Sequence, residues 1–361
     1  MDRMTEHSTF KPMAPAGQAQ SQEKSTPLQQ RTVRAAHAPS GAGIKRNTHE
    51  RHAPARALSF SVVILSWNRV QEIRQCIETI REQFSGEIVV VDQGSTDGSL
   101  EYLQSRDDLT LISLTENLGV SGGRNVGFSN AAGDVVISID SDAWFDASFN
   151  FDTLRNLFVD HPDVAVIAFK LLNTTTGDLD DWGHPYPASY ANQPFESSRF
   201  KGGAHAVRKA VFTDVGCYDE SLFFFWEEVD FAFRLLAKGH TILYSPAHLV
   251  HHDCSPVKRM RWDGGRFYYL VRNRLYVLRK YFSGWPRFSE MSFMLAGYLA
   301  MAARNRLLKD YRKAVADAFA KPLRHTLTPP ETQRLLTRWK RLDKANRRLG
   351  YLVKTKIFGR L

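Results

Sequence analysis

Cysteine is scarce in this chain. Its 361 residues include three cysteines, Cys76, Cys217 and Cys254, which form neither a CxxC pair nor a zinc-binding spacing. A disulfide-stapled scaffold and a cysteine-based zinc site are therefore excluded. We expect a reducing compartment, in which these thiols behave as ordinary small hydrophobic side chains.

Long hydrophobic runs are also missing. A membrane-spanning helix needs roughly 20 consecutive apolar residues. The longest candidate, residues 291–303, is too short and contains Ser292, Gly297 and Tyr298. No apolar segment follows the first basic residues, so we do not expect a secretory signal.

The chain lacks an even distribution of charge. Its net charge of +10 divides into +5 over residues 1–58, −15 over residues 59–257 and +20 over residues 258–361. A basic tail of this size predicts an anionic partner, either a membrane surface or nucleic acid. The sequence has no RRM, zinc-finger or helix-turn-helix signal, so we do not expect nucleic acid to be the partner.

Apolar residues interrupt the basic tail at helical spacing. They are Leu335, Leu336, Trp339, Leu342 and Leu349. This pattern suits a helix that lies on anionic lipid, but it also suits a helical subdomain with a solvated basic face. Because we expect neither a membrane span nor a secretory signal, we predict a cytoplasmic protein. If the basic helix binds lipid, the protein would attach peripherally to the inner face of the cell membrane.

The chain divides into three predicted parts. Residues 1–58 are rich in Gln, Ser, Thr, Ala and Pro, contain almost no large aliphatic side chains, and should be disordered. Residues 59–284 alternate short apolar runs with helical patterns, which predicts an α/β fold with a doubly wound sheet. The expected strands are 61–66, 88–91, 109–114, 135–139, 164–169 and 242–244, and the expected helices are 70–84, 99–105, 122–130, 152–159, 211–215 and 228–238. Residues 285–361 form a basic, amphipathic helical region.

Two carboxylates end the apolar run at 135–139. Asp140 and Asp142 share the parity of a strand and could point to one side. The carboxyl ends of strands in open α/β sheets are where ligands bind, and paired carboxylates suit a hard divalent cation.

A second acidic cluster follows an aromatic segment about ninety residues later. Glu227, Glu228 and Asp230 come directly after Phe223–Trp226. Such surroundings should raise the pKa of a carboxyl group and suit it to act as a general base. The alternative is that all three are capping carboxylates at the start of a helix.

Several motifs between Ser59 and Tyr281 together resemble the family 2 inverting glycosyltransferases, which have the GT-A fold. In order, they are VVILSWNR at 62–69, VVVDQGSTDG at 89–98, NLGVSGGRNVG at 117–127, IDSD at 139–142 and WEEVDFAFRL at 226–235. The run YYLVRN at 268–273, followed by Lys280 and Tyr281, resembles the rhamnosyltransferase-like branch. The resemblance implies a mixed sheet with a nucleotide-binding half and an acceptor half.

The resemblance also implies a nucleotide-sugar donor. The implied donor contacts are Ser66, Trp67, Asn68, Arg69, Asp92, Gly94, Ser95, Gly122, Arg124, Asn125 and Asp140. For Asp92 the alternative is a carboxylate that only caps the next turn. For the glycines at 119–127, the alternative is that they allow a helix to pack closely against its neighbours and do not contact the donor.

The remaining implied roles concern the metal, the base and the acceptor. Asp142, Asp140 and His252 would hold Mn²⁺ or Mg²⁺. There are two alternatives for the histidine: His251 is the ligand instead, or the histidine is only solvated and binds no metal. Glu228 stands where the family usually has an Asp base. The implied acceptor-side and supporting residues are Gly202, Gly203, Trp226, Glu227, Asp230 and Arg272.

The sequence therefore predicts a metal-dependent, inverting hexosyl- or deoxyhexosyltransferase with a DxD motif. Its acceptor would be a glycan, a lipid-linked molecule or a protein, in synthesis of cell-envelope polysaccharide or a related glycan. One alternative is a sugar nucleotidyltransferase, which usually has a glycine-rich basic loop after the first strand; here Trp67, Asn68 and Arg69 occupy that place. The other is an inactive protein that binds an anionic surface, which the intact Asp140, Asp142 and Glu228 disfavour.

Overall fold

The computed structural model describes residues 57–180, 190–253 and 265–342. All of these residues belong to one compact unit. The segment predicted to be disordered, 1–58, lies almost entirely outside the described residues.

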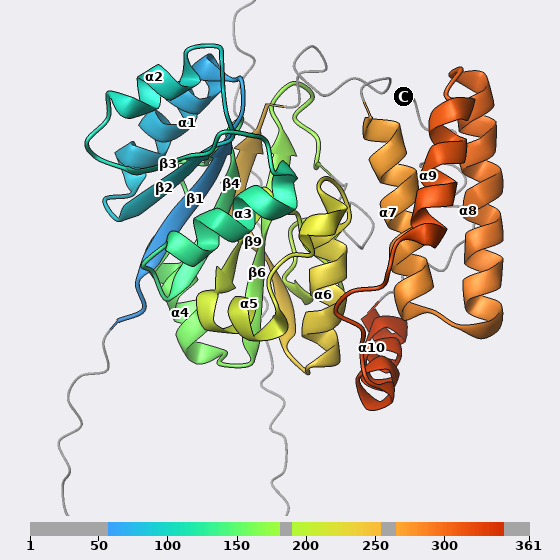
Figure 1. The fold of residues 1–361 in the computed structure, drawn as a ribbon. Coiled ribbons are helices and arrows are strands. Elements are labelled where there is room, and N and C mark those ends of the chain that lie inside the picture. The colour runs from blue at the N-terminus through green and yellow to red at the C-terminus, as the bar shows by residue number, and fades with distance from the viewer. Residues whose placement is uncertain (1–56, 181–189, 254–264, 343–361) are drawn as a thin grey trace, which may run out of the picture. The chain divides into compact units, whose positions relative to one another are not determined.

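The nucleotide half of the sheet consists of four parallel strands (Figure 1). In the order β3-β2-β1-β4 they are Thr110–Ser113, Glu87–Asp92, Phe60–Ser66 and Val135–Asp140. The helices between them are α1 (Val70–Gln83), α2 (Ser99–Gln104) and α3 (Gly119–Asn130).

Helices α1 and α3 cover opposite faces of these strands. Val62 and Ile64 of β1 share a core cluster with Ile77 of α1, whereas Val63 packs with Phe128 of α3. A strand covered on both faces has no polar face to present to water, which explains the nearly uninterrupted apolar runs in the sequence.

The acceptor half makes the sheet mixed, as the family resemblance implied. Strand β8 (Ala204–Arg208) runs antiparallel to both β4 and β6 (Val164–Asn173). Strand β9 (Thr241–His252) is parallel to β6, while β5 (Ala143–Phe145) and β7 (Phe195–Glu196) pair antiparallel with β9. The sequence patterns did not indicate β5, β7 or β8.

Strand β9 is much longer than the predicted run at 242–244. Its register against β6 shifts so that Phe169 pairs with Ser245 and Lys170 pairs with Leu249. The bulge between these pairs accommodates Pro246, which cannot donate to a regular ladder. The extra length carries His251 and His252 to the carboxyl edge of β4, where β5 pairs with them.

Helices α4 (Phe151–Asp160), α5 (Lys209–Val215) and α6 (Glu227–Ala237) complete the acceptor half. Gly239, just after α6, has a φ of 96° and ends that helix as the sequence predicted. At the opposite end, α6 begins with the two glutamates of the second acidic cluster.

Four helices follow, α7 (Arg266–Tyr281), α8 (Gly284–Arg304), α9 (Leu308–Ala320) and α10 (Pro329–Leu342). Helix α8 is the outermost of the three that stand together in Figure 1. No helix in the described part of the chain is long and apolar enough to cross a membrane.

The apolar stripe of α10 does not face outward. Leu335 and Leu342 are buried in the core cluster that includes α6, and Trp339 packs edge-on against Phe282. Arg334 donates to the carbonyl of Ala237 at 2.7 Å. The prediction that this stripe lies on lipid is therefore wrong for these residues, because α6 already covers it; Leu349 lies outside the described residues.

Candidate active site

Side chains from both halves of the sheet meet beyond the carboxyl ends of β1 and β4. Asp140 is the last residue of β4, and Asp142 lies in the turn that leads into β5. Arg69, just after β1, forms an ion pair with Asp142. Residues from two strand ends thus converge at one edge, as expected for adjacent parallel strands.

Asp140, Asp142 and His252 form a compact group of potential metal ligands. One ligand atom of each lies within 4.8 Å of the others, and His252 Nε2 is 3.3 Å from Asp142 Oδ1. Two carboxylates and an imidazole are a donor set that Mn²⁺ accepts. The residues present therefore fit a divalent cation.

The electrostatics of Asp142 favour its charged form. Burial raises the pKa of this carboxyl, but the hydrogen bond and charge of His252 and the Arg69 guanidinium outweigh burial, so that the pKa lies below its usual value. His251, the alternative ligand, is instead 2.7 Å from Asp146 through Nε2. The structure thus brings His252, and not His251, to the two aspartates.

Asp180 is a member of this site that sequence reasoning missed. It accepts from Lys201 Nζ at 2.7 Å and contacts His252 Nδ1 at 3.0 Å. Burial opposes ionisation, but Lys201 and His252 bring the pKa of Asp180 below its usual range. Asp180 lies in a polar stretch with no periodicity, so only its position in the fold identifies it.

Arg124 connects the two acidic clusters. Its buried guanidinium is 2.7 Å from Asp140 Oδ1 and 3.2 Å from Glu227 Oε1. The sequence predicted an anion-binding role for Arg124, and in the structure its partners are these carboxylates.

Gly202 and Gly203 permit this arrangement. A Cβ on Gly202 would lie 2.2 Å from Arg124 Nη1, and one on Gly203 would lie 2.0 Å from Asp140 Oδ2. Any side chain at either position would therefore displace a charged group of the site. The segment 201–205 is also held by His205, whose Nδ1 is 2.9 Å from the carbonyl of Lys201.

The loops after β1 and β2 are bound to each other. Asp92 is buried and accepts from the backbone N–H and the hydroxyl of Ser95 at 3.0 and 2.6 Å. Asn68, with a φ of 52°, accepts from the backbone N–H of Thr96 at 2.7 Å. Asp92 thus caps its turn, the alternative kept open above, and its contact with a nucleotide stays a prediction.

Other residues predicted to contact the donor lie in or next to these two loops. Ser66 is buried at the end of β1, whereas Trp67 beside it is 46% exposed and available for stacking. Gly94 has a φ of 73°, in the left-handed region that favours glycine.

The glycine-rich segment forms the first turns of α3, which begins three residues earlier than predicted. A Cβ on Gly127 would lie 2.4 Å from Val63, and one on Gly123 would lie 2.8 Å from Gln93. Close helix packing therefore accounts for these two glycines. A Cβ on Gly122 would lie 2.7 Å from the Leu118 side chain. Asn125 donates to the carbonyl of Tyr218 and accepts from its backbone N–H, both at 3.0 Å.

Glu227 and Glu228 lie in a setting unlike that of the aspartates. Oε2 of each is buried, and no N–H or O–H of a described residue donates to it. Burial raises the pKa of both carboxyls, and the charge of Glu228 raises that of Glu227 further. A backbone hydrogen bond and the charges of Arg124 and Lys201 oppose this rise in the pKa of Glu228, so Glu228 is the member of the pair that more readily carries the negative charge.

The loop before these glutamates is unusual in its backbone. Phe223, Phe225 and Trp226 have φ values of 64°, 68° and 71°. Such conformations cost energy for non-glycine residues and persist only where the surroundings fix them. Asn273 of α7 does so here, because it donates at 2.8 Å to the carbonyls of Leu222, Phe224 and Phe225.

Two residues predicted to support the acceptor side have structural partners. Arg272 donates at 2.9 Å to the carbonyls of Ser221 and Leu222. Asp230, buried in the first turn of α6, accepts from Lys280 at 2.6 Å and Arg234 at 3.0 Å. Both fix the start of α6, and with it the direction of the Glu227 and Glu228 side chains.

Comparison with known proteins finds similarity to glycosyltransferases. Residues 61–216 match the family model described as glycosyl transferase family 2. The chain is 24% identical over 267 residues to the low-salt glycan biosynthesis hexosyltransferase Agl10 of Haloferax volcanii, covering 67% of this chain and 83% of that protein. It is 33% identical over 123 residues to the glycosyltransferase GlyA of Streptococcus pneumoniae, covering 32% of this chain but only 18% of that relative's length.

Two solved structures share the fold. The structure of GalNAc-T7 with UDP, GalNAc and Mn²⁺ aligns with a TM-score of 0.53 at 16% identity, covering 85% of this chain and 59% of that one. The mannosyltransferase PcManGT of Pyrobaculum calidifontis, in complex with GDP-Man and Mn²⁺, aligns with a TM-score of 0.50 at 20% identity, covering 85% and 88%. The mixed sheet is thus of the GT-A type, and residues 61–216 are similar to the glycosyl transferase family 2 model.

Proposed function

We propose that this protein is a metal-dependent, inverting glycosyltransferase that moves a hexosyl or deoxyhexosyl group from a nucleotide-sugar to a hydroxyl acceptor. The single observation that carries the proposal is the pairing of two unlike acidic clusters across Arg124. One cluster suits a cation and the other suits a proton acceptor. The product would belong to a glycan, a polysaccharide or a lipid-linked oligosaccharide of the cell envelope.

On the donor side, Asp140, Asp142 and His252 would hold Mn²⁺ or Mg²⁺. When bound, such an ion neutralises the charge that develops on a leaving diphosphate. Mn²⁺ in the structures of GalNAc-T7 and PcManGT supports this choice of cofactor. Trp67 and the loops that Asp92 and Asn68 fix would receive the nucleoside.

On the acceptor side, Glu228 would take the proton. The acceptor oxygen forms a bond to the anomeric carbon, the bond to the diphosphate oxygen breaks, and the hydroxyl proton passes to the Glu228 carboxylate. One such displacement inverts the anomeric centre and needs only one base. Glu227, held by Arg124 and protonated more readily, would keep the adjacent Glu228 in place.

We also propose that the protein belongs to the rhamnosyltransferase-like branch. The motif that carries this resemblance, residues 268–273, lies at the start of α7, where Asn273 and Arg272 hold the loop before α6. Its residues thus act on the position of the base.

A donor screen by thermal shift tests the proposal. We expect a UDP-, GDP- or dTDP-sugar to raise the melting temperature of the full chain in the presence of Mn²⁺. Asp142→Ala should remove this shift, because it removes a cation ligand. Asp108→Ala, a surface carboxylate on the other side of the nucleotide half, is the control and should keep it. If no donor stabilises the wild-type protein, the proposal fails.

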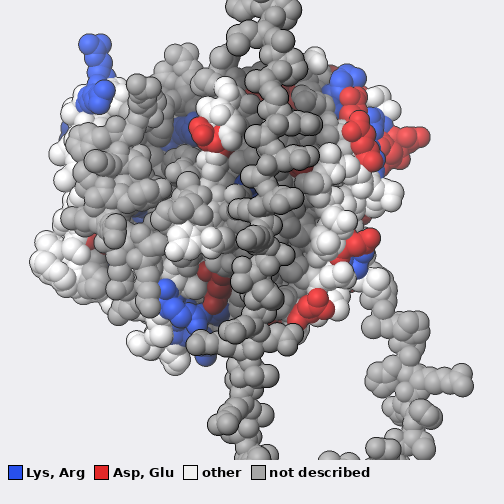
Figure 2. Space-filling view, turned by 180° about the vertical axis from the view of Figure 1, so that it is seen from behind, with Lys and Arg blue, Asp and Glu red and all other residues white. Residues whose placement is uncertain are grey.

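Exposed apolar side chains support a membrane-associated location. Nine large hydrophobic residues are conspicuously exposed in the described part of the chain, and six of them lie between 285 and 323. On α8, Trp285 is 75% exposed, Phe288 is 62% exposed and Leu299 is 46% exposed. Figure 2 shows basic side chains projecting at the upper left, on the side of the molecule where α8 lies in this view.

We propose that α8, rather than α10, rests on an anionic membrane at the cytoplasmic face, where a lipid-linked acceptor would be available. Exposed aromatic side chains with arginines nearby suit the interfacial region of a bilayer. The triple variant Trp285→Ser, Phe288→Ser and Leu299→Ser should bind phosphatidylglycerol-containing vesicles at least about tenfold more weakly in cosedimentation. Val159→Ser, which removes an equally exposed side chain on α4, should bind normally. Equal binding by the triple variant would overturn the proposal.

A further inference from the structure

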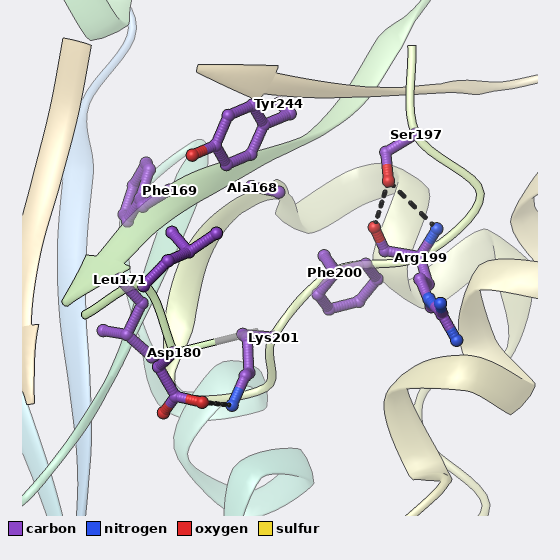
Figure 3. A pocket seen from close by; sticks show the side chains of 10 residues that line it. Ala168, Phe169, Leu171, Asp180, Ser197, Arg199, Phe200, Lys201 and Tyr244 are labelled. Atoms are coloured by element: carbon purple, nitrogen blue, oxygen red, sulfur yellow. Dashed lines mark hydrogen bonds and ion pairs between the residues drawn. The ribbon is translucent and has the colours of Figure 1, made fainter. Parts of the chain in front are cut away.

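The carboxylate of Asp180 has two partners within the site. Lys201 Nζ lies 2.7 Å from Oδ1, and His252 Nδ1 lies 3.0 Å from Oδ2. The side chain is only 8% exposed, so these contacts are largely shielded from water. Figure 3 shows the Asp180–Lys201 pair on the wall of a small cavity, about 20 Å³ in volume, that Phe169, Phe200 and Tyr244 also line. This cavity has room for about one water molecule and none for a sugar.

The contact with Asp180 determines which nitrogen of His252 is protonated. A carboxylate only accepts hydrogen bonds, so the proton between these groups belongs to Nδ1 of the imidazole. Nε2 faces Asp142, whose Oδ1 is 3.3 Å away and can accept its proton. Once Nε2 has lost that proton, its lone pair would be available to a cation held by the two aspartates. A histidine that binds a metal usually has this arrangement, in which a carboxylate fixes the ring from the opposite side.

The neighbouring histidine provides an internal comparison. His251 forms the same kind of pair with Asp146, at 2.7 Å, but through Nε2. Successive side chains of a strand point to opposite faces, so this second pair lies away from Asp142. Both pairs join a histidine to an aspartate, and the two histidines are consecutive residues of β9. Only the His252–Asp180 pair lies next to the proposed cation ligands.

Lys201 extends the arrangement toward the acceptor side. It directly precedes Gly202 and Gly203, which pack against Arg124 and Asp140, and its charge acts on Glu228. Asp180 therefore contacts both His252, a proposed cation ligand, and Lys201, the first residue of the segment that packs against Arg124 and Asp140.

We propose that Asp180 is a positioning residue that orients His252 for the cation and fixes Lys201 at the start of the segment that packs against Arg124 and Asp140. This inference rests on the proposed function, since it requires that His252 binds the cation. Asp180 touches neither substrate nor cation; it acts through its two partners.

Mn²⁺ binding to the full chain, measured by calorimetry without donor or acceptor, tests this role. Asp180→Ala should weaken Mn²⁺ binding by roughly 10- to 100-fold, the usual effect of removing the partner of a ligating histidine. Asp146→Ala, the matched change at the His251 pair, should leave the affinity unchanged. Asp180→Glu should recover part of the loss, because it restores an acceptor for Nδ1. If Asp180→Ala does not fold, Asp180→Asn takes its place, with a smaller expected loss.

His252→Ala and Asp142→Ala distinguish a failure of the cation site itself from a failure of the positioning role of Asp180. If these variants bind Mn²⁺ as well as the wild-type protein, the cation site itself is wrong. If they bind it more weakly while Asp180→Ala matches the wild type, only the positioning role is overturned. Equal weakening by Asp146→Ala and Asp180→Ala would show a general structural effect and would likewise overturn it.

Discussion

The two acidic clusters of this protein have similar residues in different surroundings. Asp142 has Arg69 and His252 as partners, and its pKa is held below the usual value. Glu227 and Glu228 lie against each other in an aromatic setting, and their pKa values are raised. Arg124 touches one carboxylate of each cluster.

This difference separates two chemical tasks that both need a carboxyl group. A carboxylate that stays charged at every working pH can hold a cation, whereas one with a raised pKa can exchange a proton near neutral pH. The fold imposes the distinction, because one cluster follows a strand end among cationic side chains and the other is buried at the start of a helix, directly after an aromatic segment.

The largest expected effect comes from removing the proposed base. Glu228→Gln keeps the size of the side chain but cannot accept a proton, and we expect turnover to fall by about 10²- to 10⁴-fold. Donor binding, measured by the thermal shift with Mn²⁺, should be retained, because the donor-side cluster is intact. Steady-state kinetics on the donor identified by the screen measures the first effect.

The pH profile of the wild-type protein provides a check on this assignment. Glu228 acts as a base only when ionised, and its pKa is raised above 4.5, the usual value for Glu. Turnover should therefore rise with pH through a value above that of an ordinary glutamate and reach a plateau. Retained turnover in Glu228→Gln, or the same rise in its profile, would place the base elsewhere.

A smaller effect is expected at the connection between the clusters. Arg124→Lys keeps the charge, but a single ammonium cannot reach Asp140 and Glu227 as the planar guanidinium does. Asp140 or the buried Glu227 then loses its charged partner, and the free energy of unfolding should fall by about 1–3 kcal/mol in urea denaturation.

Arg106→Lys is the matched control for this change. Arg106 also makes two bonds, at 2.7 and 2.8 Å, but to the single, more exposed Asp108. Surface pairs contribute little, so we expect a loss below about 1 kcal/mol. Equal losses in the two variants would show that Arg124 has no special role in joining the clusters.

Much of the nucleotide half could be predicted from sequence. Its strands are covered on both faces, so their apolar runs identify them, and parallel strands place Asp92 and Asp140 at one edge. The helical spacing at 70–84 predicted α1, and the two acidic clusters were visible as motifs. These features depend on residues close together in the chain.

The tertiary structure alone decided the rest, since each remaining feature depends on contacts between distant segments. Pairing with β5 and β6 extended β9 past Pro246 and brought His252 to Asp142. Contact with α6 buried the α10 stripe that the sequence made available for lipid. Asp180 lies in a polar segment of no regular pattern, and only the folding of that segment against β9 gives it two charged partners. The sequence determined which carboxylates are present and which strands and helices carry them, whereas burial and neighbouring charges, which exist only in the folded chain, decided what each can do.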